Sequence, residues 1–360
     1  MDMPKDIIEA IFLHLSTFDI ARGRTVCKFW DGVLRNREFL IKHAESNTED
    51  WLALFSHSPV DEKRKLLLYN DASCLWHAIS LDFLPSEFTD VIAADGGLVC
   101  IAGQFHRVYS ICVCNIVTRT YKILPHIDEV PYAGAMIVKK QKVDAECSYE
   151  IAVLLVNAVA FTSSSRSTWV KYSTMLSSMP QSPVMCNRVL YGLQNMLSPW
   201  KSNWRLVYAK LDDTSCKEVW SELYHPTWGG IIDILHQPCL VESIGCLLLV
   251  GGLGHSLTTN SCITLIILKL DLGTLEWSEA TRMPQEFYKH FDCNEDLSIF
   301  SHNGNVSLFS KAICGHLVCK LADGQSGTLW QWVEGCPLSS YETTFLSKGF
   351  LLKLGLDRIS

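Results

Sequence analysis

The chain has 360 residues, of which 48% are hydrophobic and 19% charged, and its formal net charge is −7. This apolar content predicts a folded protein with room for two domains and a sizeable core, and it excludes an intrinsically disordered chain. The acidic balance argues against nucleic-acid binding, and no apolar run is long enough to predict a membrane-spanning helix.

The first forty residues predict a small helical module. Pro4 suits the first turn of a helix, where its missing amide proton is no loss. Apolar residues then recur at three- and four-residue spacing: Ile7, Ile8, Ile11, Phe12 and Leu15. A second apolar set runs from Phe18 to Leu40. A segment this short cannot bury all of these side chains in its own core, so an apolar face is left for another chain or domain.

This stretch resembles an F-box, the helical module that docks on a Skp-type adaptor of cullin-based ubiquitin ligases. The resemblance rests on Pro-x-Asp-Ile-Ile-x-x-Ile-(x)3-Leu, then Val-Cys-Lys-x-Trp and a closing Phe-Leu, between about Met3 and His43. Met3 replaces the usual leucine. Gly23 replaces an apolar helix residue at a cost of roughly 1 kcal/mol, and Gly32 is a second weak point. The alternative is an ordinary three-helix cap on the domain behind it.

The resemblance implies an F-box of three helices over residues 1–45. It also implies an exposed apolar ridge that contacts the adaptor. We expect this ridge to comprise Pro4, Ile7, Ile8, Ile11, Leu15, Ile20, Val26, Cys27 and Trp30.

Residues 46–360 predict one large β domain, because short β-rich runs broken by turn residues replace the helical spacing. An aromatic residue recurs about every 50 residues, a period typical of the blades of a kelch-type β-propeller. These residues are Trp76, Tyr121, Trp169, Trp220, Trp277 and Trp332. We expect them to occupy equivalent, mostly buried positions in six blades, with seven blades as the main alternative.

Two further features refine this prediction. The run Leu247–Gly252 predicts a buried strand that leaves through a tight turn at its diglycine. The C-terminal segment 343–354 predicts a strand pair that completes the first blade and closes the ring, which removes exposed sheet edges.

The whole chain resembles the plant F-box/kelch-repeat proteins. The segments that carry the resemblance are Leu81–Ser86, Ala94–Cys100, Cys114–Arg119, Leu247–Gly252, Leu275–Trp277, Arg282–Pro284 and Gly335–Pro337. The family implies a substrate receptor of an SCF ubiquitin ligase in the cytoplasm or nucleus. Its F-box binds a Skp-type adaptor, and through it a cullin, while its propeller binds an unknown protein substrate. The alternative is a non-degradative scaffold or transcriptional cofactor.

We expect the substrate on the face where the loops between second and third strands emerge beside the blade-to-blade connections. The candidate residues there are His106, Arg107, Arg166, Trp200, Lys201, His255 and Tyr288. Basic and aromatic side chains on loops favour an acidic or phosphorylated protein segment. The alternative is that the aromatic residues, with Trp204, Trp228 and Phe291, pack against their own blades.

Little in the sequence indicates catalysis or metal binding. Gly254-His255-Ser256 lacks the second glycine and the strand-to-helix setting of a nucleophile elbow. The twelve histidines are scattered, and the fifteen cysteines form no Cys-x-x-Cys pair. Because the chain begins directly in the helical module, without a secretory signal, we interpret the cysteines as reduced and mostly buried. We therefore expect no enzyme activity, no metal, no other cofactor, no direct contact with nucleic acid and no membrane association.

Overall fold

The computed structural model describes residues 4–356 apart from a set of short segments. Those segments are 47–49, 59–62, 72, 106–107, 140–147, 175, 177, 197–203, 212–219, 229, 233, 255–261, 289–296, 303, 311–314, 322–327 and 336–345.

The N-terminal module contains four short helices, one more than the resemblance implied. They are α1 (Lys5–Phe12), α2 (Thr17–Gly23), α3 (Lys28–Leu34) and α4 (Arg37–Ser46). Ser16 Oγ caps α2 by accepting a hydrogen bond from the amide of Asp19 at 3.2 Å. Asn36 Oδ1 accepts from the amide of Glu38 at 2.9 Å and thereby starts α4 directly after α3. The extra helix is therefore a consequence of local capping.

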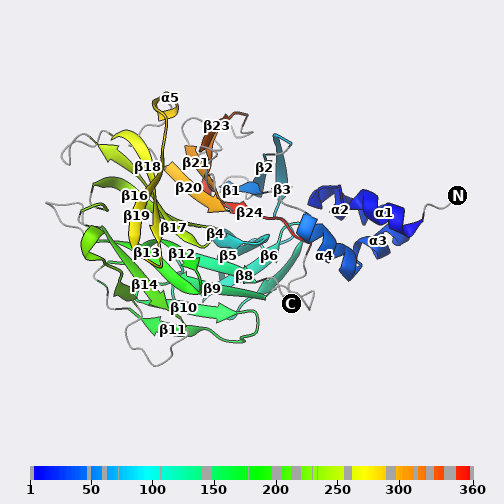
Figure 1. The fold of residues 1–360 in the computed structure, drawn as a ribbon. Helices are drawn as coiled ribbons and strands as arrows, with labels where there is room; N and C mark the ends of the chain where they lie inside the picture. The colour runs from blue at the N-terminus through cyan, green and yellow to red at the C-terminus, as the bar shows by residue number, and fades with distance from the viewer. Residues whose placement is uncertain are drawn as a thin grey trace.

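Behind the module, the described strands form six four-stranded antiparallel sheets, which are the blades of a propeller (Figure 1). The first blade comprises β24 (Leu346–Leu352), β1 (Trp51–Ser58), β2 (Lys63–Asn70) and β3 (Leu75–Ser80). The second comprises β4 (Phe88–Asp95), β5 (Leu98–Phe105), β6 (Val108–Asn115) and β7 (Thr120–Ile123). The third comprises β8 (Ala133–Lys139), β9 (Ser148–Leu154), β10 (Ala158–Ser163) and β11 (Val170–Ser173). The fourth blade comprises β12 (Gln181–Cys186), β13 (Val189–Asn195), β14 (Trp204–Lys210) and β15 (Trp220–Glu222). The fifth comprises β16 (Leu235–Ser243), β17 (Cys246–Gly254), β18 (Cys262–Asp271) and β19 (Glu276–Arg282). The sixth comprises β20 (Leu297–His302), β21 (Asn305–Ser310), β22 (Gly315–Lys320) and β23 (Leu329–Val333). Two short helical turns, η1 (Pro226–Trp228) and α5 (Gln285–Tyr288), lie between blades.

The ring is closed by the C-terminal strand. The innermost strands β24, β4, β8, β12, β16 and β20 contact one another in this order, and β20 contacts β24 again. β24 pairs with β1 so that Leu352 lies opposite Trp51. The prediction of six blades is therefore confirmed, and the C-terminal segment completes the first blade, but with the single strand β24 where a strand pair was expected.

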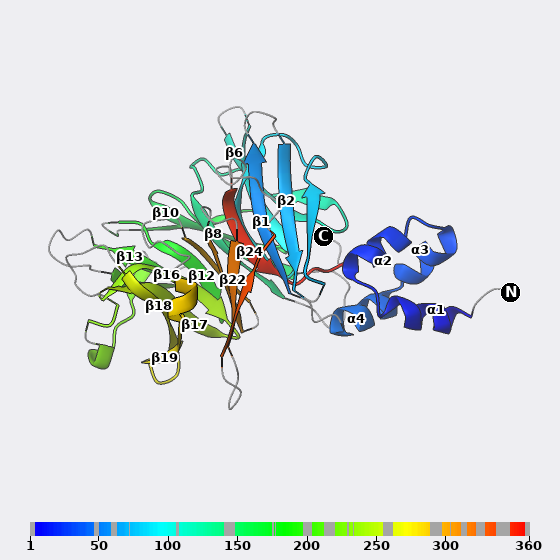
Figure 2. The ribbon, with the colours of Figure 1, turned by 90° about the horizontal axis from the view of Figure 1, so that it is seen from above.

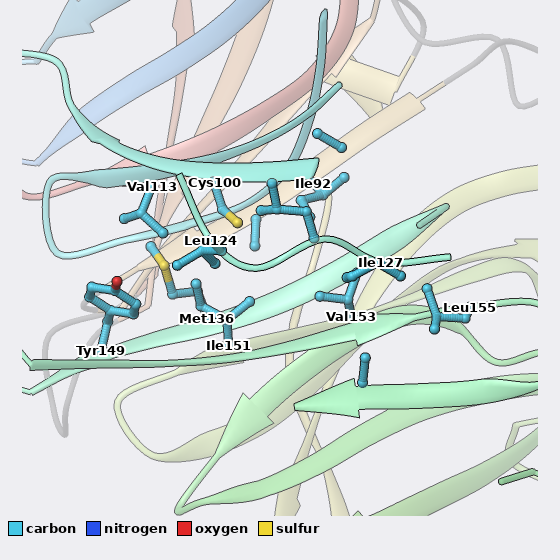
Figure 3. Packing of buried hydrophobic residues seen from close by; sticks show 14 of the residues in the cluster. Ile92, Cys100, Val113, Leu124, Ile127, Met136, Tyr149, Ile151, Val153 and Leu155 are labelled. Carbon is cyan, nitrogen blue, oxygen red and sulfur yellow. The ribbon is translucent and has the colours of Figure 1, made fainter. Parts of the chain in front are cut away.

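Six clusters of buried apolar side chains fill the spaces between successive blades. Figure 3 shows the cluster between the second and third blades: Ile92, Cys100 and Val113 on one side, Met136, Ile151 and Val153 on the other. Because each blade buries both of its faces in this way, the core is a ring of interblade layers.

The repeated aromatic residues lie near the start of the outermost strands, with two corrections. Trp76, Tyr121, Trp220 and Trp277 each lie opposite the penultimate residue of the neighbouring strand, and Trp169 immediately precedes β11. In the sixth blade Trp330, opposite Cys319, holds this position, so the choice of Trp332 was wrong. Tyr121 is 41% exposed, so the expectation that it would be mostly buried was wrong.

The diglycine Gly251-Gly252 lies inside β17 and forms no turn. A Cβ atom on Gly251 would lie 3.0 Å from the Cβ of Leu235, so the missing side chain permits the close approach of β16. The tight turn predicted there was wrong. A diglycine turn does occur between β4 and β5, where Gly96 and Gly97 have φ of +53° and +87°.

Candidate functional site

Helix α1 divides its apolar side chains between the module core and the surface. Ile8 and Phe12 are buried in that core, where the Phe12 ring meets the Trp30 ring edge-on at 5.0 Å. On the other side, Ile7 is 51% exposed and Ile11 is 48% exposed. Because these two residues are four positions apart, they lie on one helix face. Burying this face would require another surface.

The corner between α2 and α3 adds further exposed apolar side chains. Val26 is 62% exposed and Phe29 is 52% exposed. The corner is held by Asp31, which accepts from Arg35 at 2.7 Å and from Arg24 at 3.2 Å. The hydrogen bond from Arg35, followed by that from Arg24, holds the pKa of the Asp31 carboxyl below its usual value.

The predicted adaptor ridge is only partly exposed. Pro4, Ile7, Ile11, Val26 and Cys27 are exposed, whereas Leu15 and Trp30 are half-buried against the core of the module.

The expectation that Ile8 and Ile20 would be exposed was wrong, because they are 8% and 0% exposed inside that core. The F-box-like sequence pattern therefore includes residues that form the core of the module as well as residues that face outward. Phe29 was missed, although it follows Val26 at helical spacing. We use the name apolar ridge below for Pro4, Ile7, Ile11, Val26 and Phe29.

The module is attached to the propeller by apolar contacts. Phe18 of α2 lies edge-on to Trp51 at 5.2 Å and stacks on His77 at 5.9 Å. Leu356, beyond β24, is 7% exposed and belongs to the core of the helices. Figures 1 and 2 show the chain reaching from β24 to these helices. The C-terminal end of the described chain therefore lies at the junction between the module and the propeller.

The propeller has two faces, which the strand directions define. The amide of Val138 donates to Asp95 Oδ2 at 2.6 Å, so β4 and β8 end on the same face. That face also carries the start of β1 and residues 353–356, and we call it the helix-side face. The opposite face, here the distal face, carries the blade connections such as 81–87 and 124–132 and the turns between second and third strands.

The predicted substrate residues do not form one described site. His106, Arg107, Trp200, Lys201 and His255 lie outside the described residues. Tyr288, in α5, lies on the blade connection after β19 and packs against the core between the fifth and sixth blades.

Arg166 lies on the helix-side face, so its placement with the others was wrong. Its loop was expected between the second and third strands, but those strands are β9 and β10, and residues 155–157 connect them. The Arg166 segment therefore follows the third strand of its blade, and the guanidinium lies over the Phe161 ring at 5.5 Å.

Trp228 has a structural role. Its side chain is 7% exposed, its Nε1 donates to the carbonyl of Leu275 at 2.5 Å, and its ring lies 5.7 Å from that of Trp277. It therefore packs between blades, as the alternative interpretation held.

Exposed apolar side chains gather on the distal face. They are Val108, Val130, Tyr132, Val156, Tyr224 and Ile234, each between 38% and 60% exposed. No charge cluster suited to a metal ion occurs, since the described residues contain no group of three His, Cys, Asp or Glu side chains that could hold one.

The buried cysteines are poor nucleophiles. Burial raises the pKa of Cys112 to about 12 and raises those of Cys100 and Cys114 well above the usual value. Among the described helices, none has the length and apolar character needed to cross a membrane.

Comparison with known proteins gives several relatives, although no protein-family model matches the chain. It is 30% identical to SKP1-interacting partner 15 of Arabidopsis thaliana, over 93% of its own length and 92% of that protein. It is 23% identical to an F-box/kelch-repeat protein of the same plant, over 99% and 89% of the two chains. Protein UNUSUAL FLORAL ORGANS, also from A. thaliana, is 23% identical over 94% and 79%.

Among solved structures, a chain of a nidogen/laminin complex superposes with a TM-score of 0.50 at 12% identity. The match covers 84% of this chain and 98% of that one, and it supports the fold alone.

Proposed function

The chain belongs to the plant F-box/kelch-repeat proteins, and on this basis we propose that it is the substrate-recognition subunit of an SCF ubiquitin ligase. The helical module binds a Skp-type adaptor, which links it to a cullin. The propeller binds the protein to be ubiquitinated in the cytoplasm or nucleus, and the chain itself supplies no catalytic step.

The observation that carries the proposal is the apolar ridge. Ile7, Ile11, Val26 and Phe29 are each about half exposed or more, although the module has a core of its own. At about 25 cal/mol per Å² of apolar surface, covering such side chains is favourable. SKP1-interacting partner 15 is named for its interaction with SKP1, and an adaptor of this kind could cover the apolar ridge.

The arrangement of the two domains also supports a receptor. The module contacts the helix-side face through Phe18, Val117 and Leu356. An adaptor bound to the module would leave the distal face open for a substrate. The two partners then bind opposite sides of one protein.

The test is co-purification of a Skp-type adaptor with the variant Ile7→Ser/Ile11→Ser. Both side chains are about half exposed, so the double change should leave the melting temperature nearly unchanged while reducing adaptor recovery more than tenfold. Ile41→Ser is the matched control, because Ile41 is 41% exposed on α4, outside the ridge. Undiminished adaptor recovery by the double variant would refute the proposed docking surface.

The degradative role has a separate readout. A bound partner should accumulate in cells when residues 1–46 are removed, because the substrate is still bound but no longer ubiquitinated. A partner that is recovered equally, at unchanged abundance, with and without the module would instead indicate a scaffold.

A further inference from the structure

The connection between the second and third blades, residues 124–132, is fixed at both ends by hydrogen bonds. Ile127 exchanges two backbone hydrogen bonds with Tyr109, at 2.9 and 3.2 Å. The amide of Tyr132 donates to the carbonyl of Leu154 at 3.1 Å. Trp169 Nε1 donates to the carbonyl of Pro125 at 2.8 Å. A surface held in this way requires little ordering when a partner binds.

This connection presents apolar side chains to the outside as well as to the core. Leu124 and Ile127 are 5% and 0% exposed and point into the interblade layer (Figure 3). Val130 is 48% exposed and Tyr132 is 38% exposed, and neither belongs to that layer.

Two neighbouring turns place further exposed apolar side chains beside this connection. Val108 precedes Tyr109, which bridges to Ile127, and Val156 lies two residues beyond Leu154, which bonds to Tyr132. Val108 is 38% exposed and Val156 is 58% exposed. We call Val108, Val130, Tyr132 and Val156 the connector patch. Scattered exposed apolar residues are common, but four on joined segments indicate an interaction surface.

Carboxylates predominate in the described connections and turns of the distal face. The described residues of the blade connections and second-to-third-strand turns on the distal face contain no lysine or arginine. They contain these carboxylates: Asp82, Glu87, Asp128, Glu129, Glu286 and Glu334. Asp128 is 89% exposed although it pairs with Lys171 at 3.2 Å. The described turns of the helix-side face instead carry three arginines, Arg119, Arg166 and Arg188, with the carboxylate of Asp71.

We propose that the substrate binds the connector patch through a segment that combines apolar anchors with lysine or arginine. Its apolar side chains cover Val130, Tyr132 and Val156, and its cations lie against Asp128 and Glu129. This inference rests on the proposed receptor function and names the chemistry of the substrate. It differs from the acidic or phosphorylated segment expected from the sequence, because the described connections of the distal face carry carboxylates.

The first test selects binders from a library of displayed short random peptides on the full chain bound to its adaptor. The expected result is enrichment of peptides that contain both apolar and basic residues. Their affinity should fall at least tenfold with Val130→Ser/Val156→Ser, and it should weaken as salt is raised. Enrichment of acidic peptides, or no enrichment, would overturn the proposal.

The second test uses charge-neutral variants on the selected peptides. Asp128→Asn/Glu129→Gln should reduce affinity several-fold at low salt. Glu276→Gln, at the helix-side end of β19, is the matched control and should have no effect. Affinity unchanged by both patch variants would place binding elsewhere and overturn the proposal.

Adaptor binding is measured in the same preparations. Failure of the peptide tests while the adaptor stays bound refutes this inference alone. Failure of the unaltered chain to bind the adaptor refutes the receptor function, even if peptides still bind the connector patch.

Discussion

His316 makes the stability of the closed ring depend on pH. Its side chain is 1% exposed in β22, and its ring lies edge-on to Tyr69 at 4.9 Å and to Trp76 at 5.7 Å. Neither ring nitrogen has a hydrogen-bond partner among the described residues. Burial, opposed only partly by the charge of Asp71, lowers the pKa of His316 from 6.5 to about 4. The residue packs where the sixth blade meets the first.

The sign of the effect follows from linkage. Because the pKa is lower in the folded state, the unfolded chain binds a proton first as pH falls below about 6.5. The contribution of His316 to stability is therefore constant above that pH and decreases down to about pH 4. Lowering the pKa from 6.5 to about 4 corresponds to roughly 3 kcal/mol in full, and to about 2 kcal/mol at about pH 5.

The perturbation is His316→Phe, which keeps an aromatic ring between Tyr69 and Trp76 and removes the titration. In urea unfolding, the unaltered protein should lose about 2 kcal/mol more than the variant between about pH 7.5 and about pH 5. His14→Gln, at an exposed position of the module, is the control and should behave like the unaltered protein. Equal pH dependence in the unaltered protein and the His316→Phe variant would refute the reasoning.

Three further changes test other parts of the fold. Arg64 is 5% exposed and donates to the carbonyls of Leu84, Pro85 and Phe88 at 2.6–2.9 Å, so Arg64→Met should destabilise the propeller by about 2–4 kcal/mol in urea unfolding. Leu356→Ala should lower the local stability of α1–α4, measured by amide hydrogen exchange, by about 2–5 kcal/mol and leave the propeller blades unaffected. Equal protection of these helices in the variant and the unaltered protein would contradict the place of Leu356 in the module core. A Cβ atom on Gly349 would lie 2.5 Å from Phe300 and 2.8 Å from a methyl group of Leu54, so Gly349→Val should lower stability by about 1–3 kcal/mol, and a neutral result would contradict tight packing of β24.

The architecture could be predicted because its signals repeat. The helical spacing after Pro4 predicts the module, and the aromatic period predicts six blades. Positions within a blade were harder, because residues two apart in a strand face the same side. Trp330 and Trp332 therefore satisfy the same pattern, and only the register opposite Cys319 separates them.

The candidate sites were harder to predict, because they depend on where each strand begins and ends. Arg166 was placed on the wrong face because residues 155–157, and not the loop after Phe161, connect the second and third strands of the blade. Ile8 and Ile20 share their hydrophobicity with Ile7 and Ile11, and helical spacing alone does not say which side another helix covers. The connector patch had no motif, since it arises from three segments that backbone hydrogen bonds bring together.

The C-terminal segment completes both domains, which has a consequence during synthesis. The first blade lacks its inner strand until β24 pairs with β1, and the module core lacks Leu356 until residues 353–356 are made. Neither the ring nor the module core is therefore complete before the ribosome has released residue 356. Nascent and prematurely terminated chains keep an unpaired strand edge on β1, which chaperones and proteases recognise. Folding of the first blade and of the module core is thereby completed only after residues 346–356 have been made.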